Sequence, residues 1–290
     1  MLGPLLLAVG VGLAVLRLHA GRRTERAYAD ARPPGADAIV PGAEGFTLEG
    51  STSRALLLLH GFGDTPQTLR YLGGRLHAAG FTVRAPLLPG HGRGLRDFAR
   101  ASADDYASAA RDELARLRER ASWVGVIGLS MGGAIAASLT ADAEDVRLLV
   151  LLAPYLTPPR PVALLARTAP LWSLAVPYFG GRGGESSVHD PVARAESFAY
   201  GMIPPSAVRA LCSTAAAGRR ALPSISVPTL VVNSREDNRI PFVLAETATA
   251  SLAGPTERRW VTGCGHVITV DYCRDVVADM VLDFLARHAD

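Results

Sequence analysis

Five residues, Gly128-Leu129-Ser130-Met131-Gly132, decide the fold prediction for this chain. The apolar residues 123–127 before them read as a buried β-strand, and the alanine-rich residues 131–142 after them are compatible with a helix. The pattern G-x-S-x-G at a strand-to-helix turn is typical of a sharp bend that holds the serine out of the sheet. Only glycine fits two positions before and after such a serine, because a Cβ atom would clash with neighbouring backbone. Ser130 is therefore the candidate nucleophile.

A serine hydroxyl is a poor nucleophile at neutral pH, so it needs a histidine base, a carboxylate that orients the base, and donors for an oxyanion. In the chain order Ser, acid, His, the base follows Ser130, which leaves His189, His266 and His288. His266 follows a predicted strand at residues 257–261 on a glycine-containing loop, and we expect it to be the base. We expect the other two histidines to be solvated surface groups.

The orienting acid is expected on a loop after another predicted strand, at residues 228–233. Asp237 and Glu236 both lie on this loop. Asp271 comes after His266 near the start of the last predicted helix, where a carboxylate more often stabilises the helix N-terminus. The order of residues alone leaves Asp237 and Glu236 as alternatives.

Two backbone N–H groups are expected to hold the oxyanion. Met131 follows the nucleophile and supplies the first. The second is expected from Phe62, because the uninterrupted apolar residues 55–59 predict a strand that leads directly into the loop carrying Phe62. His60, at the start of that loop, is interpreted as a residue that supports the loop.

The chain resembles the α/β-hydrolase superfamily, and within it the bacterial carboxylesterases and monoacylglycerol lipases. The resemblance covers almost everything from about residue 45 to the end. It is carried by four motifs in one order and by a fifth segment, Pro89-Gly90-His91-Gly92, in which His91 would have a structural role. The four motifs are His60-Gly61-Phe62-Gly63-Asp64, Gly128-Leu129-Ser130-Met131-Gly132-Gly133, an acid before Ile240-Pro241, and Gly263-Cys264-Gly265-His266-Val267.

This resemblance implies a role for each candidate site residue. Ser130 would be the nucleophile, Asp237 the acid and His266 the base. Phe62 and Met131 would be the oxyanion donors. The resemblance thus favours Asp237 over the neighbouring glutamate.

Alternating short apolar segments and helix-compatible segments predict a doubly wound, mostly parallel α/β sheet with the site at the carboxyl ends of the strands. Residues 45–155 and 206–290 would form the two parts of this core. Residues 156–205 break the alternation with several prolines, aromatic residues such as Trp172, Tyr178 and Phe179, and a glycine cluster at residues 180–184. A long irregular stretch inside a compact domain is often a functional cap or lid. We expect this insertion to form an apolar acyl-binding pocket.

The first 20 residues predict a hydrophobic N-terminal segment and a candidate membrane anchor, since residues 1–16 carry no charge. Arginines follow this segment, so the positive-inside tendency predicts a membrane-associated protein with a cytoplasmic catalytic body. A cleaved export signal and a helix packed on the body are the alternatives. Residues 21–44 read as a linker, because residues 31–35 are rich in proline.

Composition limits the other function classes. The chain has 290 residues, 49% of them hydrophobic, a formal charge of +3 and only arginine as its basic residue. This length suits one core with an insertion, and the scattered charge disfavours nucleic acid as a partner. Cys212, Cys264 and Cys273 lack metal-ligand spacing and are interpreted as apolar fillers that form neither a disulfide framework nor a zinc site. No phosphate or dinucleotide loop is present in the sequence, and no cofactor or metal is expected.

The expected function is that of a serine hydrolase that cleaves carboxylic esters through an acyl-enzyme. Short- to medium-chain acyl esters or monoacylglycerols are the expected substrates. The same residues would also suit a thioesterase, a lactonase, an amidase or a hydrolase of carbon–carbon bonds. A non-catalytic, membrane-tethered binding protein on this scaffold is the alternative from a different class.

Overall fold

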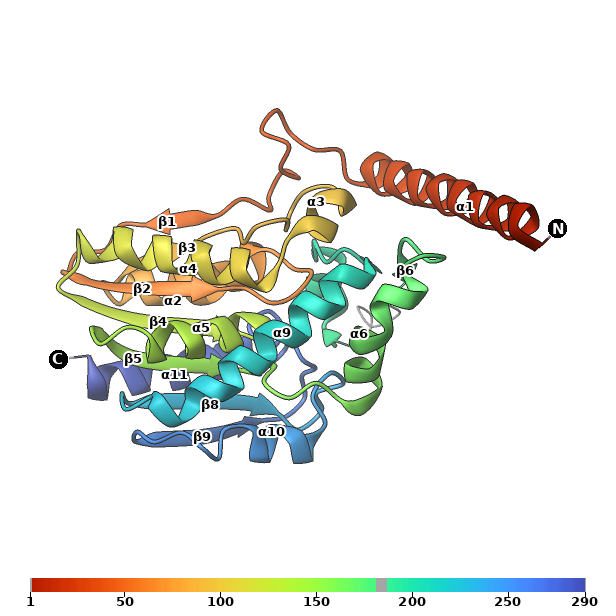
Figure 1. Ribbon diagram of the computed structural model, residues 1–290. Helices are drawn as coiled ribbons and strands as arrows, with labels where there is room; N and C mark the ends of the chain where they lie inside the picture. Colours follow the sequence, from red (N-terminus) through yellow and green to blue (C-terminus); the bar gives the residue numbers. More distant parts are fainter. Residues whose placement is uncertain (1, 181–186, 290) are drawn as a thin grey trace.

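The computed structural model describes residues 2–180 and 187–289, and its centre is a seven-stranded sheet (Figure 1). The strand order is β1-β3-β2-β4-β5-β8-β9. Only β1 runs antiparallel to its neighbour, and the other pairs are parallel. The strands are β1 (Phe46–Leu48), β2 (Arg54–Leu59), β3 (Thr82–Ala85), β4 (Trp123–Leu129), β5 (Val146–Leu152), β8 (Thr229–Ser234) and β9 (Thr256–Val261).

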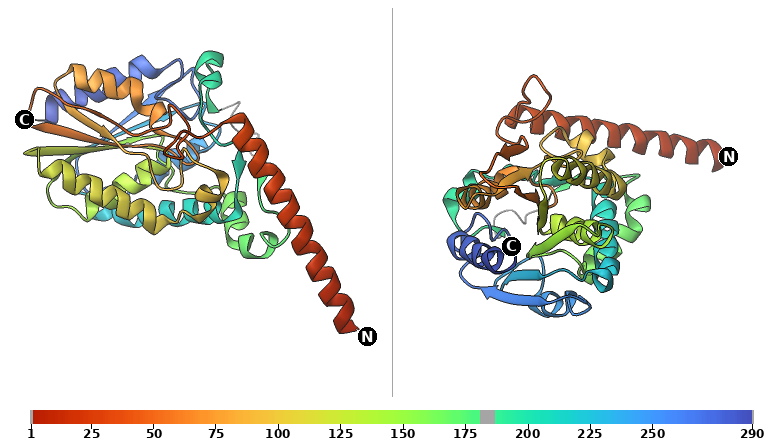
Figure 2. Two further views of the ribbon diagram at one scale, coloured as in Figure 1. Left: turned by 90° about the horizontal axis from the view of Figure 1, so that it is seen from above. Right: turned by 90° about the vertical axis from the view of Figure 1, so that its left-hand side faces the viewer.

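Helices cover both faces of the sheet, so the predicted doubly wound architecture is confirmed (Figure 2). Two large apolar clusters lie between the helices and the two sheet faces. One face is covered by α2 (Arg70–Ala78) and α11 (Arg274–His288), and the other by α4 (Ala103–Arg118), α5 (Met131–Ala141), α9 (Pro205–Ala221) and α10 (Phe242–Ala248). The shorter helices α3 (Leu95–Arg100), η1 (Pro66–Leu69) and η2 (Leu222–Ser224) lie in the connections.

Small residues allow α5 and α9 to pack closely. A Cβ atom added to Gly218 of α9 would lie 2.5 Å from the carbonyl oxygen of Ala134 in α5. No real side chain tolerates that separation, so this contact requires glycine. The contact holds α9, which follows the insertion, against α5, which follows Ser130.

Residues 156–205, which the sequence analysis assigns to an insertion, lie between β5 and α9. They contain α6 (Arg160–Trp172), β6 (Phe179–Gly180), α8 (Pro191–Ala195) and β7 (Met202–Ile203), with β6 and β7 paired antiparallel. The glycine cluster continues into residues 181–186, which lie outside the described residues. The insertion lies beyond the carboxyl ends of the parallel strands (Figure 1).

The N-terminal helix α1 (Leu2–Ala31) is longer than the sequence analysis predicts. Residues 21–31, assigned there to a linker, continue the helix, because the prolines that stop it begin only at Pro33. The irregular connection therefore runs from residue 32 to β1. Within the described residues, no helix has an apolar stretch of the length that crossing a membrane requires. The membrane anchor stays a prediction.

Candidate active site

Ser130 lies at the turn between β4 and α5 with φ 55° and ψ −116°, a backbone conformation that residues with a side chain rarely adopt. Its N–H donates to the carbonyl of Leu152 at 2.9 Å, which ties the turn to β5. A Cβ atom at Gly128 would lie 2.2 Å from the Gly132 carbonyl oxygen, and one at Gly132 would lie 2.1 Å from that of Leu59. The predicted need for both glycines is confirmed.

The structure brings Ser130, His266 and Asp237 together, although they lie on three different loops. Ser130 Oγ lies 2.8 Å from His266 Nε2, and His266 Nδ1 lies 2.7 Å from Asp237 Oδ2. An ionised carboxylate only accepts hydrogen bonds, so Nδ1 carries the ring proton and Nε2 accepts from the hydroxyl. The side chains of His266 and Asp237 are 9% and 2% exposed, which keeps water away from these two hydrogen bonds.

Backbone N–H groups hold the Asp237 carboxylate in place. Its Oδ1 accepts from Arg239 at 2.7 Å and from Ile240 at 2.9 Å. Burial pushes the pKa of Asp237 upward, but His266 and these two N–H groups outweigh burial and hold the pKa below its ordinary value. The carboxylate is therefore ionised at neutral pH and able to orient the imidazole.

Asp237 and its sequence neighbour Glu236 have different hydrogen-bond partners in the structure. Glu236 Oε1 accepts from the N–H of Gly263 at 2.8 Å and so supports the loop that carries His266. The other two histidines have different neighbours. His189 Nδ1 lies 3.8 Å from a carboxylate oxygen of Glu236. The His288 ring packs on Phe284 in α11. Of the two candidate acids, Asp237 bonds the imidazole of His266, and Glu236 bonds the Gly263 N–H instead.

The loop after β2 lies directly against the serine. A Cβ atom at Gly61 would lie 3.4 Å from the Cβ atom of Ser130 and 3.9 Å from its Oγ. Within the described residues, no acceptor takes the N–H of Phe62 or that of Met131. Met131 follows Ser130 directly, and Phe62 follows Gly61, which lies against Ser130, so both N–H groups stay candidates for the oxyanion donors.

His60 and His91 support this region by accepting hydrogen bonds from backbone N–H groups. His60 Nε2 accepts from the N–H of Leu88 at 3.0 Å, and His91 Nε2 accepts from the N–H of Gly63 at 3.1 Å. Burial lowers the pKa of His60 well below its ordinary value and that of His91 to about 4. Both rings are neutral at pH 7, which agrees with the supporting part expected for them.

Asp64, in the same loop, is a buried carboxyl that the sequence analysis did not single out. It accepts from the N–H of Thr65 at 2.9 Å. Burial raises its pKa to about 7, although Thr65, Thr68 and nearby His266 act in the opposite direction.

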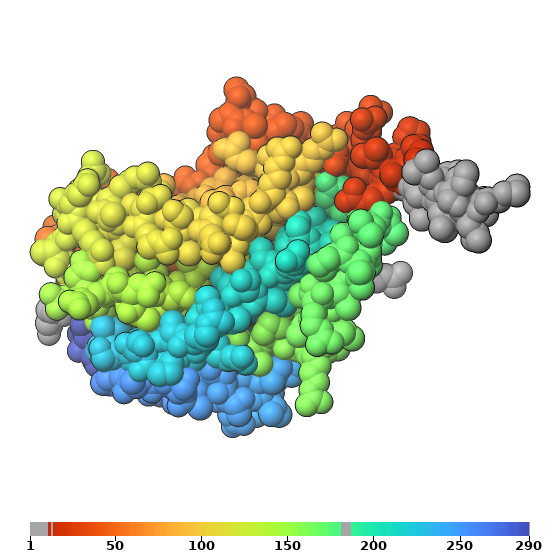
Figure 3. All heavy atoms as spheres, in the orientation of Figure 1, coloured from red at the N-terminus to blue at the C-terminus, as the bar shows by residue number. Residues whose placement is uncertain are grey.

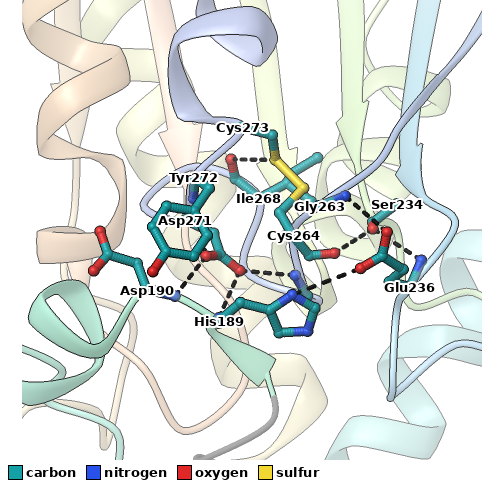
Figure 4. The surroundings of a disulfide bond; sticks show 11 residues. His189, Asp190, Ser234, Glu236, Gly263, Cys264, Ile268, Asp271, Tyr272 and Cys273 are labelled. Carbon is teal, nitrogen blue, oxygen red and sulfur yellow. Dashed lines mark hydrogen bonds and ion pairs between the residues drawn. A yellow bond between two sulfur atoms is a disulfide. The ribbon is translucent and has the colours of Figure 1, made fainter.

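Cys264 and Cys273 form a disulfide, so their interpretation as apolar fillers is wrong (Figure 4). Their Cα atoms lie 5.8 Å apart because the loop after β9 turns back on itself before α11. The sequence does not indicate this pair, because it has an odd number of cysteines and Cys264 and Cys273 are only nine residues apart. The bridge closes the segment that carries His266, while Cys212 is a free, half-buried thiol.

The position of Asp271 in the sequence suggests that it stabilises the start of α11. In the structure its side chain makes other bonds instead. Its fully buried carboxylate accepts four backbone N–H bonds of 2.7–2.9 Å, two from the loop of His266 and two from the insertion just before α8 (Figure 4). The four donors are Gly265, Tyr272, His189 and Asp190. Burial raises the pKa of Asp271, but these bonds outweigh it and keep the pKa low. The carboxylate therefore ties the insertion to the segment beside His266.

The described residues contain no cluster of side chains that could bind a metal ion. Across residues 2–180 and 187–289, no group of three or more His, Cys, Asp or Glu side chains gathers as the ligands of an ion would. The hydrogen-bonded Ser130, His266 and Asp237 can perform acyl transfer with their own groups.

Residues 56–280 match the family model described as the alpha/beta hydrolase family. The chain belongs to this family. The match runs from β2 into α11 and includes Ser130, Asp237 and His266.

Curated relatives of this hydrolase are lipases and esterases. It is 28% identical to a thermostable monoacylglycerol lipase of Bacillus sp. (strain H-257), over 87% of this chain and 97% of that protein. It is also 28% identical to a carboxylesterase of Bacillus subtilis (strain 168), over 83% of this chain and 96% of that protein. The chain is thus an α/β-hydrolase of the lipase and esterase type.

Solved structures agree with this assignment. One, described as belonging to the metagenome-derived lipolytic enzymes LipS and LipT, is 27% identical with a TM-score of 0.79, over 86% of this chain and all of that chain. A monoacylglycerol lipase of Paleococcus ferrophilus is 17% identical with a TM-score of 0.73, over 84% of this chain and 98% of that chain, and shows the shared fold.

Proposed function

We propose that this α/β-hydrolase is a serine esterase that cleaves carboxylic esters of short- to medium-chain acyl groups, monoacylglycerols among them, through an acyl-enzyme. The observation that carries the proposal is the unbroken hydrogen-bond chain from Ser130 Oγ through His266 to Asp237. Lipases and esterases among the relatives support the bond type.

The geometry supports the following sequence of events. His266 Nε2 takes the hydroxyl proton as Ser130 Oγ attacks the ester carbonyl, and Asp237 stabilises the imidazolium that forms. The N–H groups of Phe62 and Met131 hold the oxyanion of the tetrahedral intermediate. His266 then gives its proton to the leaving alcohol. Water enters, His266 takes its proton, and the same steps release the carboxylic acid and restore Ser130.

The insertion suits the apolar part of such a substrate. It lies beyond the carboxyl ends of the strands, where the site of a doubly wound sheet lies, and Asp271 ties the segment before α8 to the loop of His266 (Figures 1 and 4). We assign it the part of a cap that shields the acyl chain from water.

Two matched variants test the assignment of the acid. Asp237→Asn is expected to lower kcat by about 10³-fold or more, because the imidazole loses the partner that fixes its tautomer. Glu236→Gln, one residue away, is expected to stay within about tenfold of the wild-type kcat. Turnover of a p-nitrophenyl ester measures both. A larger loss in Glu236→Gln than in Asp237→Asn would reverse the assignment.

A probe and a substrate panel test the function itself. A fluorophosphonate should label the wild type and leave Ser130→Ala unlabelled, and that variant should lose about 10⁴-fold or more of the ester turnover. p-Nitrophenyl esters, monoacylglycerols, lactones and acyl thioesters are then compared by kcat/KM. Preference for a thioester or lactone would replace the proposed bond, and an unlabelled wild type would favour a binding protein.

The Cys264–Cys273 disulfide is informative about the cellular compartment of the catalytic body. Disulfides persist in oxidising compartments and are rare in the cytosol, so the Cys264–Cys273 bridge supports a catalytic body outside the cytoplasm, with residues 1–31 retained, over a cytoplasmic catalytic body. A membrane-impermeant thiol reagent applied to intact and to lysed cells, with and without reductant, tests this proposal. If Cys264 and Cys273 were reduced, and the reagent labelled them only after lysis, the catalytic body would be cytoplasmic.

A further inference from the structure

Large apolar side chains lie exposed on two elements far apart in the sequence. On α1, Leu16 is 66% exposed and Leu18 is 53% exposed. At the end of α6 and just beyond it, Leu171 and Leu174 are 73% and 72% exposed. Isolated exposed leucines are common, but a group of them on neighbouring elements marks an interaction surface.

Specific contacts make these two elements one surface. Arg17 Nε on α1 donates to the carbonyl of Ser173 at 2.6 Å. Glu25 on α1 accepts from the hydroxyl of Tyr178 at 2.7 Å, and Gly21 packs against Pro177. In the space-filling view the described end of α1 lies against the insertion (Figure 3). Exposed leucines thus lie close in sequence to both partners of the Arg17–Ser173 contact, Leu16 and Leu18 beside Arg17 and Leu171 and Leu174 near Ser173.

A basic cavity of about 290 Å³ lies between α1 and α6, bounded also by residues of α3 and by the start of α9. Its charged lining residues are one carboxylate, Glu25, and four guanidinium groups, on Arg17, Arg22, Arg96 and Arg209. Arg96 pairs with Glu25 at 2.7 Å. In the described part of the chain, Arg22 and Arg209 have no hydrogen-bond or ion-pair partner. The cavity thus holds an excess of positive charge with free donors.

We propose that this combined surface, made of residues 16–25 of α1, the end of α6 and the arginine cavity, docks on a bilayer that contains anionic phospholipid. The leucines enter the boundary between head groups and acyl chains, and the guanidinium groups of Arg22 and Arg209 bind lipid phosphate. Guanidinium forks match the oxygens of a phosphate group. A protein partner would account for the leucines without requiring the arginines, and a soluble phosphate would account for the arginines alone.

Docking on this surface gives the hydrolase access to lipid. The insertion lies on the side of the molecule where the parallel strands end, which is the side of Ser130 (Figure 1). The surface therefore brings that side close to the bilayer. This last step rests on the proposed function, because it takes the substrate to be an ester with an acyl chain, whereas docking itself does not require turnover.

Vesicle binding by the full chain tests the proposal without any substrate. Vesicles of phosphatidylcholine alone are compared with vesicles in which about a third of the lipid is phosphatidylglycerol, by flotation at low and high salt. Wild type is expected to bind the anionic vesicles at least about tenfold more tightly, with a strong loss at high salt. Arg22→Glu/Arg209→Glu is expected to remove this preference.

Matched variants separate this surface from general charge and apolarity. Arg219→Glu/Arg220→Glu makes the same charge change at the other, exposed end of α9 and is expected to bind as wild type. Leu171→Gln/Leu174→Gln is expected to weaken binding to anionic vesicles about tenfold, whereas Val243→Gln/Val276→Gln, at exposed valines on α10 and α11, is not. Circular dichroism melting checks that each variant is folded.

Three results would overturn the proposal. These are equal binding to both kinds of vesicle, equal losses in the surface and control pairs, and inorganic phosphate binding at the arginines without vesicle binding. Ester turnover, measured separately on a soluble p-nitrophenyl ester, keeps the two proposals apart. Vesicle binding without turnover would leave docking standing and contradict the esterase, and turnover without vesicle binding would do the reverse.

Discussion

At the scale of single residues, Asp64 is a buried carboxyl whose ionisation is opposed by folding. Its pKa is about 7 in the folded protein against 3.8 as its ordinary value. Between these values the folded state keeps a proton that the unfolded state has lost. The free energy of unfolding therefore falls as the pH rises from about 4 to 7, and the full cost is present above pH 7.

Asp64→Asn is expected to remove this cost, because an amide oxygen still accepts from Thr65 and carries no charge. Its melting temperature should exceed that of the wild type by about 3 °C or more at pH 8 and by clearly less at pH 5. Scanning calorimetry at both pH values measures this. Asp142→Asn, at an exposed carboxylate, is the control, and an equal shift at both pH values in Asp64→Asn would contradict the argument.

At the scale of elements, the segment between β9 and α11 depends on its disulfide. Replacing Cys264 and Cys273 together by alanine opens a loop of nine-residue separation, which is expected to lower the free energy of unfolding by about 2–3 kcal/mol. The same change should lower kcat more than it raises KM, because His266 lies two residues from Cys264. Urea unfolding and ester kinetics measure the two effects. Cys212→Ala should change neither, and an unaltered kcat in the double variant would show that the bridge does not position His266.

The contact between α5 and α9 makes a second prediction at this scale. Gly218→Ala should destabilise the protein by about 1–3 kcal/mol, since its methyl group would lie 2.5 Å from the Ala134 carbonyl oxygen. Gly74→Ala is the matched control, because a Cβ atom on this exposed helical glycine of α2 meets nothing within 4 Å. That control should be neutral or stabilising by up to about 1 kcal/mol. Urea unfolding compares them, and equal stabilities would mean that the two helices can move apart at no cost.

At the scale of the whole molecule, α1 stands apart from the apolar core. Among the α1 side chains that the structure describes, none belongs to either of the two large buried clusters. These side chains contact the rest of the molecule through the stacking of Tyr28 on Tyr200 and through polar contacts of Arg17 and Glu25. Removal of residues 1–31 should therefore lower the melting temperature by no more than about 4 °C. Scanning calorimetry measures the shift. Loss of the cooperative transition would show that α1 is part of the folding unit.

Most of the sheet could be predicted because its central strands are short apolar runs with helix-compatible segments between them. β1 was missed, since three residues carry too little pattern and this strand is set by pairing with β3. Residues 21–31 were misassigned because arginine and alanine suit a helix as well as a polar linker. The disulfide could not be inferred, because cysteine spacing says nothing about the path of the loop between them.

The sequence by itself determined the turn at Ser130, because its two glycines and the flanking strand and helix act over a few residues. It also determined which side chains could serve chemistry. Only the tertiary structure decided that His266, 136 positions from Ser130, meets the hydroxyl, and that Asp237 rather than Glu236 meets the imidazole. The reason is that parallel strands bring their carboxyl ends to one edge of the sheet whatever their separation along the chain, while the direction of each loop side chain depends on packing.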